Sequence, residues 1–130
     1  MIYGEKFVNE ACMTKISDNA SLNLCGVETN IYVYANEGPI PHFHINIGND
    51  EGCIMIKESQ YFDHNNNCKL KLNSTQSKEL QEWMTSIPEG QSINNWKRIV
   101  EMWNRNNPEK YKTINNSCKQ PNYSYIKPFK

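Results

Sequence analysis

The apolar residues of this 130-residue chain change their spacing once, near residue 73, and this change restricts the folds open to it. Before that point, short apolar segments alternate with polar residues or run continuously, which is typical of strands. Beyond it, apolar residues recur every three or four positions, which is typical of amphipathic helices. This order predicts an α+β fold: a mainly antiparallel β-meander of about five strands with two C-terminal amphipathic helices packed on one face.

Five segments carry the strand pattern: 21–25, 29–35, 42–47, 53–57 and 69–72. Segment 29–35 is apolar or aromatic on both faces, so we expect it to be a central strand. Pro39 and Pro41 cannot donate to a ladder, so pairing should begin at residue 42. Residues 48–52 are predicted to form the turn of a hairpin, Tyr61 and Phe62 to continue the sheet, and segment 69–72 to form an edge strand.

The two helices follow. Asn73 or Ser74 is the expected N-cap of the first, which Pro88 ends, and the second should begin near Ser92 and stop at residues 106–108. The expected inner faces are Leu80, Trp83, Met84 and Ile87, and then Ile93, Trp96, Ile99, Val100 and Trp103. We expect the three tryptophans to be core residues.

Charged residues are distributed unequally along the chain, and no linker sequence is evident. Residues 97–130 hold eight Lys/Arg and two Asp/Glu, whereas residues 1–96 hold six and twelve, so a basic end balances an acidic body. We therefore predict a single α+β domain over residues 1–108 and a basic, aromatic C-terminal tail over residues 109–130. Lysines interleaved with tyrosines suit nucleic acid, although the tail could equally lie on the acidic body.

The cysteines and the N-terminus predict a cytoplasmic protein. No segment reaches the ~18 apolar residues of a membrane span, and the first residues lack the apolar stretch of a signal peptide. The five cysteines are odd in number, widely spaced and without a C-x-x-C pair. This fits reduced core thiols better than a disulfide framework.

His42 and His44 are the strongest candidates for a site. On a strand they share a face about 7 Å apart, which suits two ligands of one metal or an acid–base pair. The plainer interpretation is two polar residues at the start of a strand, bonded to backbone. Cys53 and His64 are weak further metal candidates, with Cys68 near them, whereas Asp50 and Glu51 are expected in the turn at the far end of the strand. No known ligand spacing results, so we expect neither a metal nor another cofactor.

The pattern around His42 and His44 does not match the known catalytic or metal-binding histidine motifs. Histidine-triad hydrolases alternate three histidines on a strand, but Asn46 occupies the third position here. Cupins place a Glu four or five residues after the second His, where this chain has none before Glu51. A second H-x-[ST] motif and the glycine-rich phosphate loops are also missing.

The segment Pro41-His42-Phe43-His44-Ile45, after a strand and an Asn-rich turn and before a hairpin and a tryptophan-bearing helix, resembles a small uncharacterised bacterial family. The hallmark of that family is P-P-H-F-H followed by an apolar residue, and Ile40 replaces its first proline here. The resemblance covers roughly residues 29–85. It implies a gene context of mobile elements or toxin–antitoxin-like pairs.

The leading hypothesis is therefore a small regulatory protein of such an element, not an enzyme, that acts by contact with a protein partner, as a phage-type inhibitor of a host machine would. One alternative is a hydrolase or ribonuclease centred on His42 and His44, with or without a metal. Another is nucleic-acid binding through the tail. The residues expected to bind a partner or ligand are His42, His44, Asn46, Lys119, Tyr123, Tyr125 and Lys127.

Overall fold

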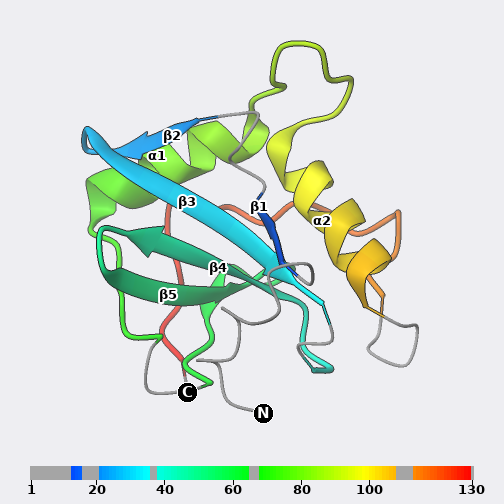
Figure 1. Ribbon diagram of the computed structural model, residues 1–130, viewed down its shortest axis with the longest axis horizontal. Coiled ribbons are helices and arrows are strands. Elements are labelled where there is room, and N and C mark those ends of the chain that lie inside the picture. Colours follow the sequence, from blue (N-terminus) through cyan, green and yellow to red (C-terminus); the bar gives the residue numbers. More distant parts are fainter. Residues whose placement is uncertain (1–12, 16–20, 36–37, 65–67, 108–112, 130) are drawn as a thin grey trace.

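We describe a computed structural model of the chain over residues 13–15, 21–35, 38–64, 68–107 and 113–129 (Figure 1). Strands come first and helices last, as predicted. They are β1 (Met13–Lys15), β2 (Leu22–Leu24), β3 (Val27–Tyr34), β4 (His42–Ile47), β5 (Asp50–Met55), β6 (Gln60–Tyr61), α1 (Ser74–Thr85) and α2 (Asn95–Asn106). The α+β fold is confirmed.

The sheet is antiparallel and runs in the order β1-β3-β4-β5-β6, with β2 also paired to β3. β3 is central, as predicted, because its residues pair with β4 and with the two short strands β1 and β2. β4 begins at His42, the first residue after Pro41, as the proline argument requires. β6 follows a break at Ser59, whose φ of 52° is left-handed.

The hairpin between β4 and β5 is tighter than the sequence suggested. Ile47 pairs with Asp50, so Gly48 and Asn49 alone form the turn. Gly48 has a φ of 61°, a conformation that a two-residue hairpin turn needs and that glycine adopts without strain. The expectation that Asp50 and Glu51 belong to the turn is therefore wrong, and Glu51 becomes a strand residue.

The predicted edge strand at residues 69–72 is not formed. The chain there makes only a parallel bridge between Cys68 and Glu51, and the Leu70 amide donates to the Glu51 carbonyl at 2.8 Å. Gly52 permits this approach, since a Cβ on it would lie 2.8 Å from the Leu70 carbonyl oxygen. Contact with β5 thus fixes the segment without a regular ladder.

Asparagine caps both helices. The Asn73 side chain accepts from the Gln76 amide while the Gln76 side chain accepts from the Asn73 amide, and Asn94 caps α2. The three tryptophans are buried, as predicted. Ile87 is not on the inner face as expected: it lies beyond the end of α1 and is 60% exposed.

The C-terminal segment, coloured orange to red in Figure 1, forms a bridge to β6 between Lys127 and Gln60 and adds side chains to the core. The Tyr61 amide donates to the Lys127 carbonyl at 2.8 Å, and the Lys127 amide donates to the Ser59 carbonyl at 2.9 Å. Ile114, Tyr123 and Ile126 are buried. Within the described residues, no helix has the length and apolarity needed to cross a membrane.

Candidate metal centre

His42 and His44 lie on the face of β4 opposite Phe43 and Ile45, as the alternation predicts. Phe43 and Ile45 are in the hydrophobic core, but the histidine side is covered as well, because His42 is only 1% exposed and His44 0%. The sheet is thus buried on both faces at this point. Two imidazoles are held away from bulk water, where polar groups need specific partners.

Aromatic rings form the cover. The Tyr34 ring stacks on His44 with centroids 4.4 Å apart and planes within 16°. The Phe62 ring meets His42 edge-on at 4.9 Å, and the Trp103 ring of α2 lies 5.6 Å from His42. Elements far apart in sequence therefore fix the position of both imidazoles.

His64 joins the pair. The Phe62 amide donates to the Cys53 carbonyl at 2.8 Å, and this extends the chain after β6 along β5 and over the histidines. The ring centroid of His64 lies 4.7 Å from that of His42 and 5.7 Å from that of His44. One potential ligand nitrogen from each ring lies within 4.8 Å of the other two. We call His42, His44 and His64 the histidine cluster.

The sequence indicated His64 only as a weak metal candidate. The signal that could have found it was the predicted continuation of the sheet through Tyr61 and Phe62. Had that strand been paired with β5, His64 would have fallen beside the histidine face.

Two hydrogen bonds fix the tautomers of the pair. His42 Nδ1 lies 2.7 Å from the Ile40 carbonyl oxygen, and His44 Nδ1 lies 2.5 Å from Glu51 Oε2. Both partners are acceptors, so each Nδ1 carries a proton and donates it, and the neutral form of each ring has its lone pair on Nε2. Metal-ligating histidines almost always donate their second nitrogen to a carbonyl or carboxylate in this way.

A second group lies on the Nδ1 side of His44. Glu51, Cys53 and Cys68 bring ligand atoms that, with one from His44, all lie within 4.8 Å of one another. Cys53 is the cross-strand partner of His44, and Glu51 follows on the same face. Both sulfurs are buried, and the Glu51 side chain is 12% exposed.

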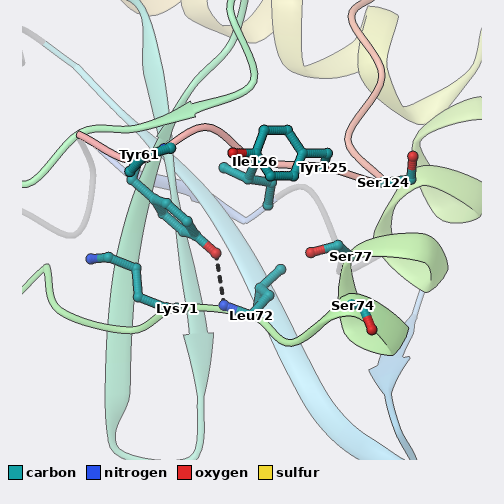
Figure 2. A pocket seen from close by; sticks show the side chains of 9 residues that line it. Tyr61, Lys71, Leu72, Ser74, Ser77, Ser124, Tyr125 and Ile126 are labelled. Atoms are coloured by element: carbon teal, nitrogen blue, oxygen red, sulfur yellow. Dashed lines mark hydrogen bonds between the residues drawn. The ribbon is translucent and has the colours of Figure 1, made fainter. Parts of the chain in front are cut away.

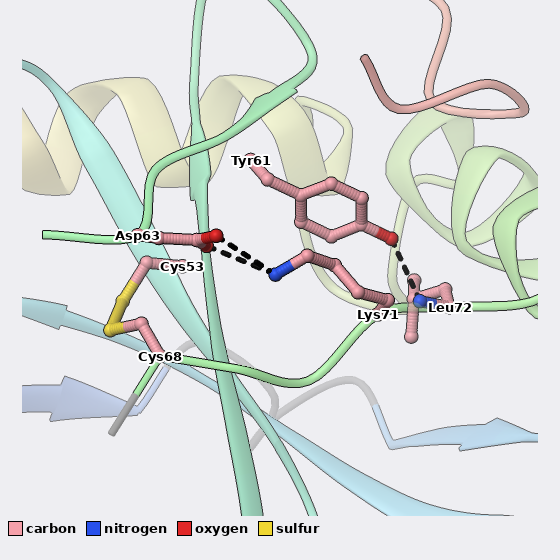
Figure 3. Close-up of polar contacts among 6 residues, drawn as sticks. All are labelled: Cys53, Tyr61, Asp63, Cys68, Lys71 and Leu72. Atoms are coloured by element: carbon pink, nitrogen blue, oxygen red, sulfur yellow. Dashed lines mark hydrogen bonds and ion pairs between the residues drawn. A yellow bond between two sulfur atoms is a disulfide. The ribbon is translucent and has the colours of Figure 1, made fainter. Parts of the chain in front are cut away.

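Cys53 and Cys68 form a disulfide, shown in Figure 3, so the expectation of reduced thiols is wrong for these two. The bridge of residue 68 to β5 places their Cα atoms 5.5 Å apart, within the range of disulfides. Cys25 and Cys118 are free.

The positions of Cys53 and Glu51 around His44 argue against cysteine–histidine catalysis. Cys53 Sγ lies 3.4 Å from His44 Nδ1, the atom that already donates to Glu51. A nucleophile–base–orienter arrangement needs the nucleophile and the carboxylate on opposite nitrogens of the ring. Here both share one nitrogen, so Glu51 cannot orient His44 as the base for Cys53.

The remaining predicted binding residues do not gather at the cluster. Tyr123 is fully buried, with its hydroxyl donating to the Ile56 carbonyl at 2.5 Å, so its ring is part of the core. Tyr125, Lys119 and Lys127 are exposed. Asn46 is half-buried, and its Oδ1 makes no hydrogen bond to any residue that the structure describes.

Comparison of the chain with protein-family models, curated proteins and solved structures found no match. The resemblance to the P-P-H-F-H family stays a prediction.

Proposed function

We propose that this chain is a transition-metal-binding protein whose histidine cluster holds one ion of the zinc class. The observation that carries the proposal is the convergence of three imidazoles, with a potential ligand nitrogen from each within 4.8 Å of the others. Imidazole is a favoured ligand of zinc, and three histidines with a fourth, open position is a known zinc arrangement.

Two further features support a metal over a polar cluster held by hydrogen bonds alone. The Ile40 carbonyl and the Glu51 carboxylate set both rings of β4 in the tautomer with the ligating lone pair on Nε2. The rings are also held by stacking and by the strand, so binding an ion costs little ordering entropy. His64 is only half-buried, unlike the two fully buried histidines of β4.

The test is zinc titration of the purified, disulfide-bonded protein by calorimetry. We expect one ion per chain, and loss of at least about tenfold in affinity for His64→Ala, which removes one of three ligands. Asp63→Asn is the matched control: Asp63 is the neighbour of His64 but pairs with Lys71 (Figure 3). Absence of binding at micromolar zinc, or binding that His64→Ala leaves unchanged, would refute the proposal.

A hydrolase or ribonuclease at the same centre is the catalytic version of this proposal. Three protein ligands leave one position in which zinc could activate water. Incubation of the zinc-loaded protein with RNA and with a chromogenic phosphodiester decides it: turnover that His44→Ala abolishes supports the enzyme, and no turnover leaves metal binding alone.

Contact with a protein partner, in the cytoplasm, is the second candidate, and one surface favours it. A groove of about 470 Å³ lies between β6, α1 and the C-terminal segment (Figure 2). Its lining is mostly apolar, and Tyr125 beside it is 67% exposed. An exposed aromatic residue next to an apolar groove is typical of a protein contact. Capture of one stoichiometric partner by the native chain but not by Tyr125→Ala would support it.

A further inference from the structure

We propose that reduction of the Cys53–Cys68 disulfide creates a second metal site, with Cys53, Cys68, His44 and Glu51 as its four ligands. We call this group the thiolate site. Glu51 and Cys53 approach His44 at its Nδ1, and the site would take a zinc-class ion. Its ligand atoms all lie within 4.8 Å of one another.

The donor set fits zinc. Two thiolates, one imidazole and one carboxylate are the ligand types that zinc uses, in the number that a closed tetrahedral site needs. The two sulfurs and His44 are fully buried, and Glu51 is nearly so, which excludes competing water. Two thiolates and a carboxylate also carry negative charge that a divalent cation offsets, whereas the same charges buried together without an ion would be costly.

The backbone holds the four residues together independently of the sulfur–sulfur bond. Cys53 faces His44 across the ladder between β4 and β5, and Glu51 is two residues before it on the same face. Cys68 is tied to β5 by its bridge to Glu51 and by the hydrogen bond from the Leu70 amide to the Glu51 carbonyl. Breaking the disulfide therefore leaves both sulfurs beside His44.

The chemistry balances with a dithiol reductant of the kind that reducing compartments contain. Exchange with the dithiol breaks the Cys53–Cys68 bond, gives two thiols and leaves the reductant as a disulfide. Binding of one Zn²⁺ then releases the two thiol protons. Glu51 exchanges its hydrogen bond with His44 for the ion, and the proton of His44 moves from Nδ1 to Nε2.

This shift couples the two sites. A neutral imidazole carries its proton on one nitrogen and its ligating lone pair on the other, so His44 serves one site at a time. In the disulfide form its lone pair is on Nε2, the nitrogen that the proposal assigns to the histidine cluster. In the reduced form the ion on Nδ1 leaves the histidine cluster with two ligands. The redox state thus selects which site holds the metal. This coupling rests on the proposed function, whereas the thiolate site itself does not depend on it.

Cobalt(II) is the probe, because thiolate ligands give it a near-ultraviolet charge-transfer band that imidazoles do not. Wild-type protein is measured oxidised and after reduction with a water-soluble phosphine, which becomes its oxide by taking an oxygen from water. We expect the band in the reduced protein alone. Cys53→Ser/Cys68→Ser should abolish it, and Cys25→Ser, which removes an exposed thiol outside the group, should keep it.

His64→Ala separates the two proposals. The variant should lose zinc binding in the oxidised protein but keep the thiolate band when reduced, so failure of the histidine cluster does not conceal the thiolate site. Circular dichroism checks the fold of each form. Reduced wild type that shows no band, or that unfolds and does not regain structure with cobalt, overturns the inference, as does a band that survives in the double cysteine variant.

Discussion

Tyr123→Phe tests whether the basic C-terminal segment is truly core. The Tyr123 hydroxyl donates to the Ile56 carbonyl, which also accepts from Trp96 Nε1 at 3.3 Å. The variant removes one hydrogen bond but leaves that carbonyl with Trp96, so we expect a loss of about 1 kcal/mol in the free energy of unfolding at neutral pH.

The pH dependence of that loss is the sharper result. Burial raises the pKa of Tyr123 well above its ordinary value. Below about pH 10 both states keep the phenol proton, and the group adds no pH dependence to stability. Above it the unfolded state releases the proton first, so wild-type stability falls as the pH rises, by about 1.4 kcal/mol at pH 11 from this group. The loss continues until the folded state also releases its proton.

Phenylalanine has no such proton. The lost hydrogen bond therefore favours wild type at every pH of the series, whereas the titration of Tyr123 lowers the stability of wild type alone at high pH. The advantage of wild type should shrink with rising pH and vanish at about pH 10.6. Urea unfolding followed by circular dichroism, at a series of pH values from about 8 to 11, measures both proteins. Tyr125→Phe, at an exposed tyrosine two residues away, is the matched control variant. A constant difference for Tyr123→Phe would refute the burial of this residue.

Three further predictions follow from other contacts. Gly52→Ala should destabilise the fold by about 1–3 kcal/mol in urea unfolding, because its Cβ would overlap the Leu70 carbonyl; an unchanged midpoint would contradict this approach of the chain to β5. Asn73→Ala removes the side-chain oxygen that accepts from the Gln76 amide and should cost about 1 kcal/mol in the same assay, while Asn73→Ser should recover most of it. Glu51→Gln should weaken zinc binding by the oxidised protein about 10–100-fold in calorimetry, because it removes the carboxylate that His44 Nδ1 donates to; an unchanged affinity would mean that this contact does not tune the centre.

The sequence by itself determined the kinds of elements and most of their bounds. Alternation is a local property of a strand, so it placed Phe43 and Ile45 toward the core and both histidines on the other face. Proline has no amide proton, so Pro41 fixed where pairing starts. The helical period, with Asn73 or Ser74 as the cap of the first helix, located α1 and α2 and placed their tryptophans inside, although α2 begins at Asn95 and not near Ser92.

Only the tertiary structure decided the site. Whether Glu51 lies in a turn or a strand depends on the register of one hairpin, and a two-residue turn brought its carboxylate to His44. His64 and Cys68 reach β4 and β5 through contacts between segments that are distant from these strands in sequence, which no local period encodes. Burial of the histidine face and of Tyr123 likewise depends on distant parts of the chain. Local periodicity records which side a residue faces, whereas the partners it meets there depend on how the elements pack.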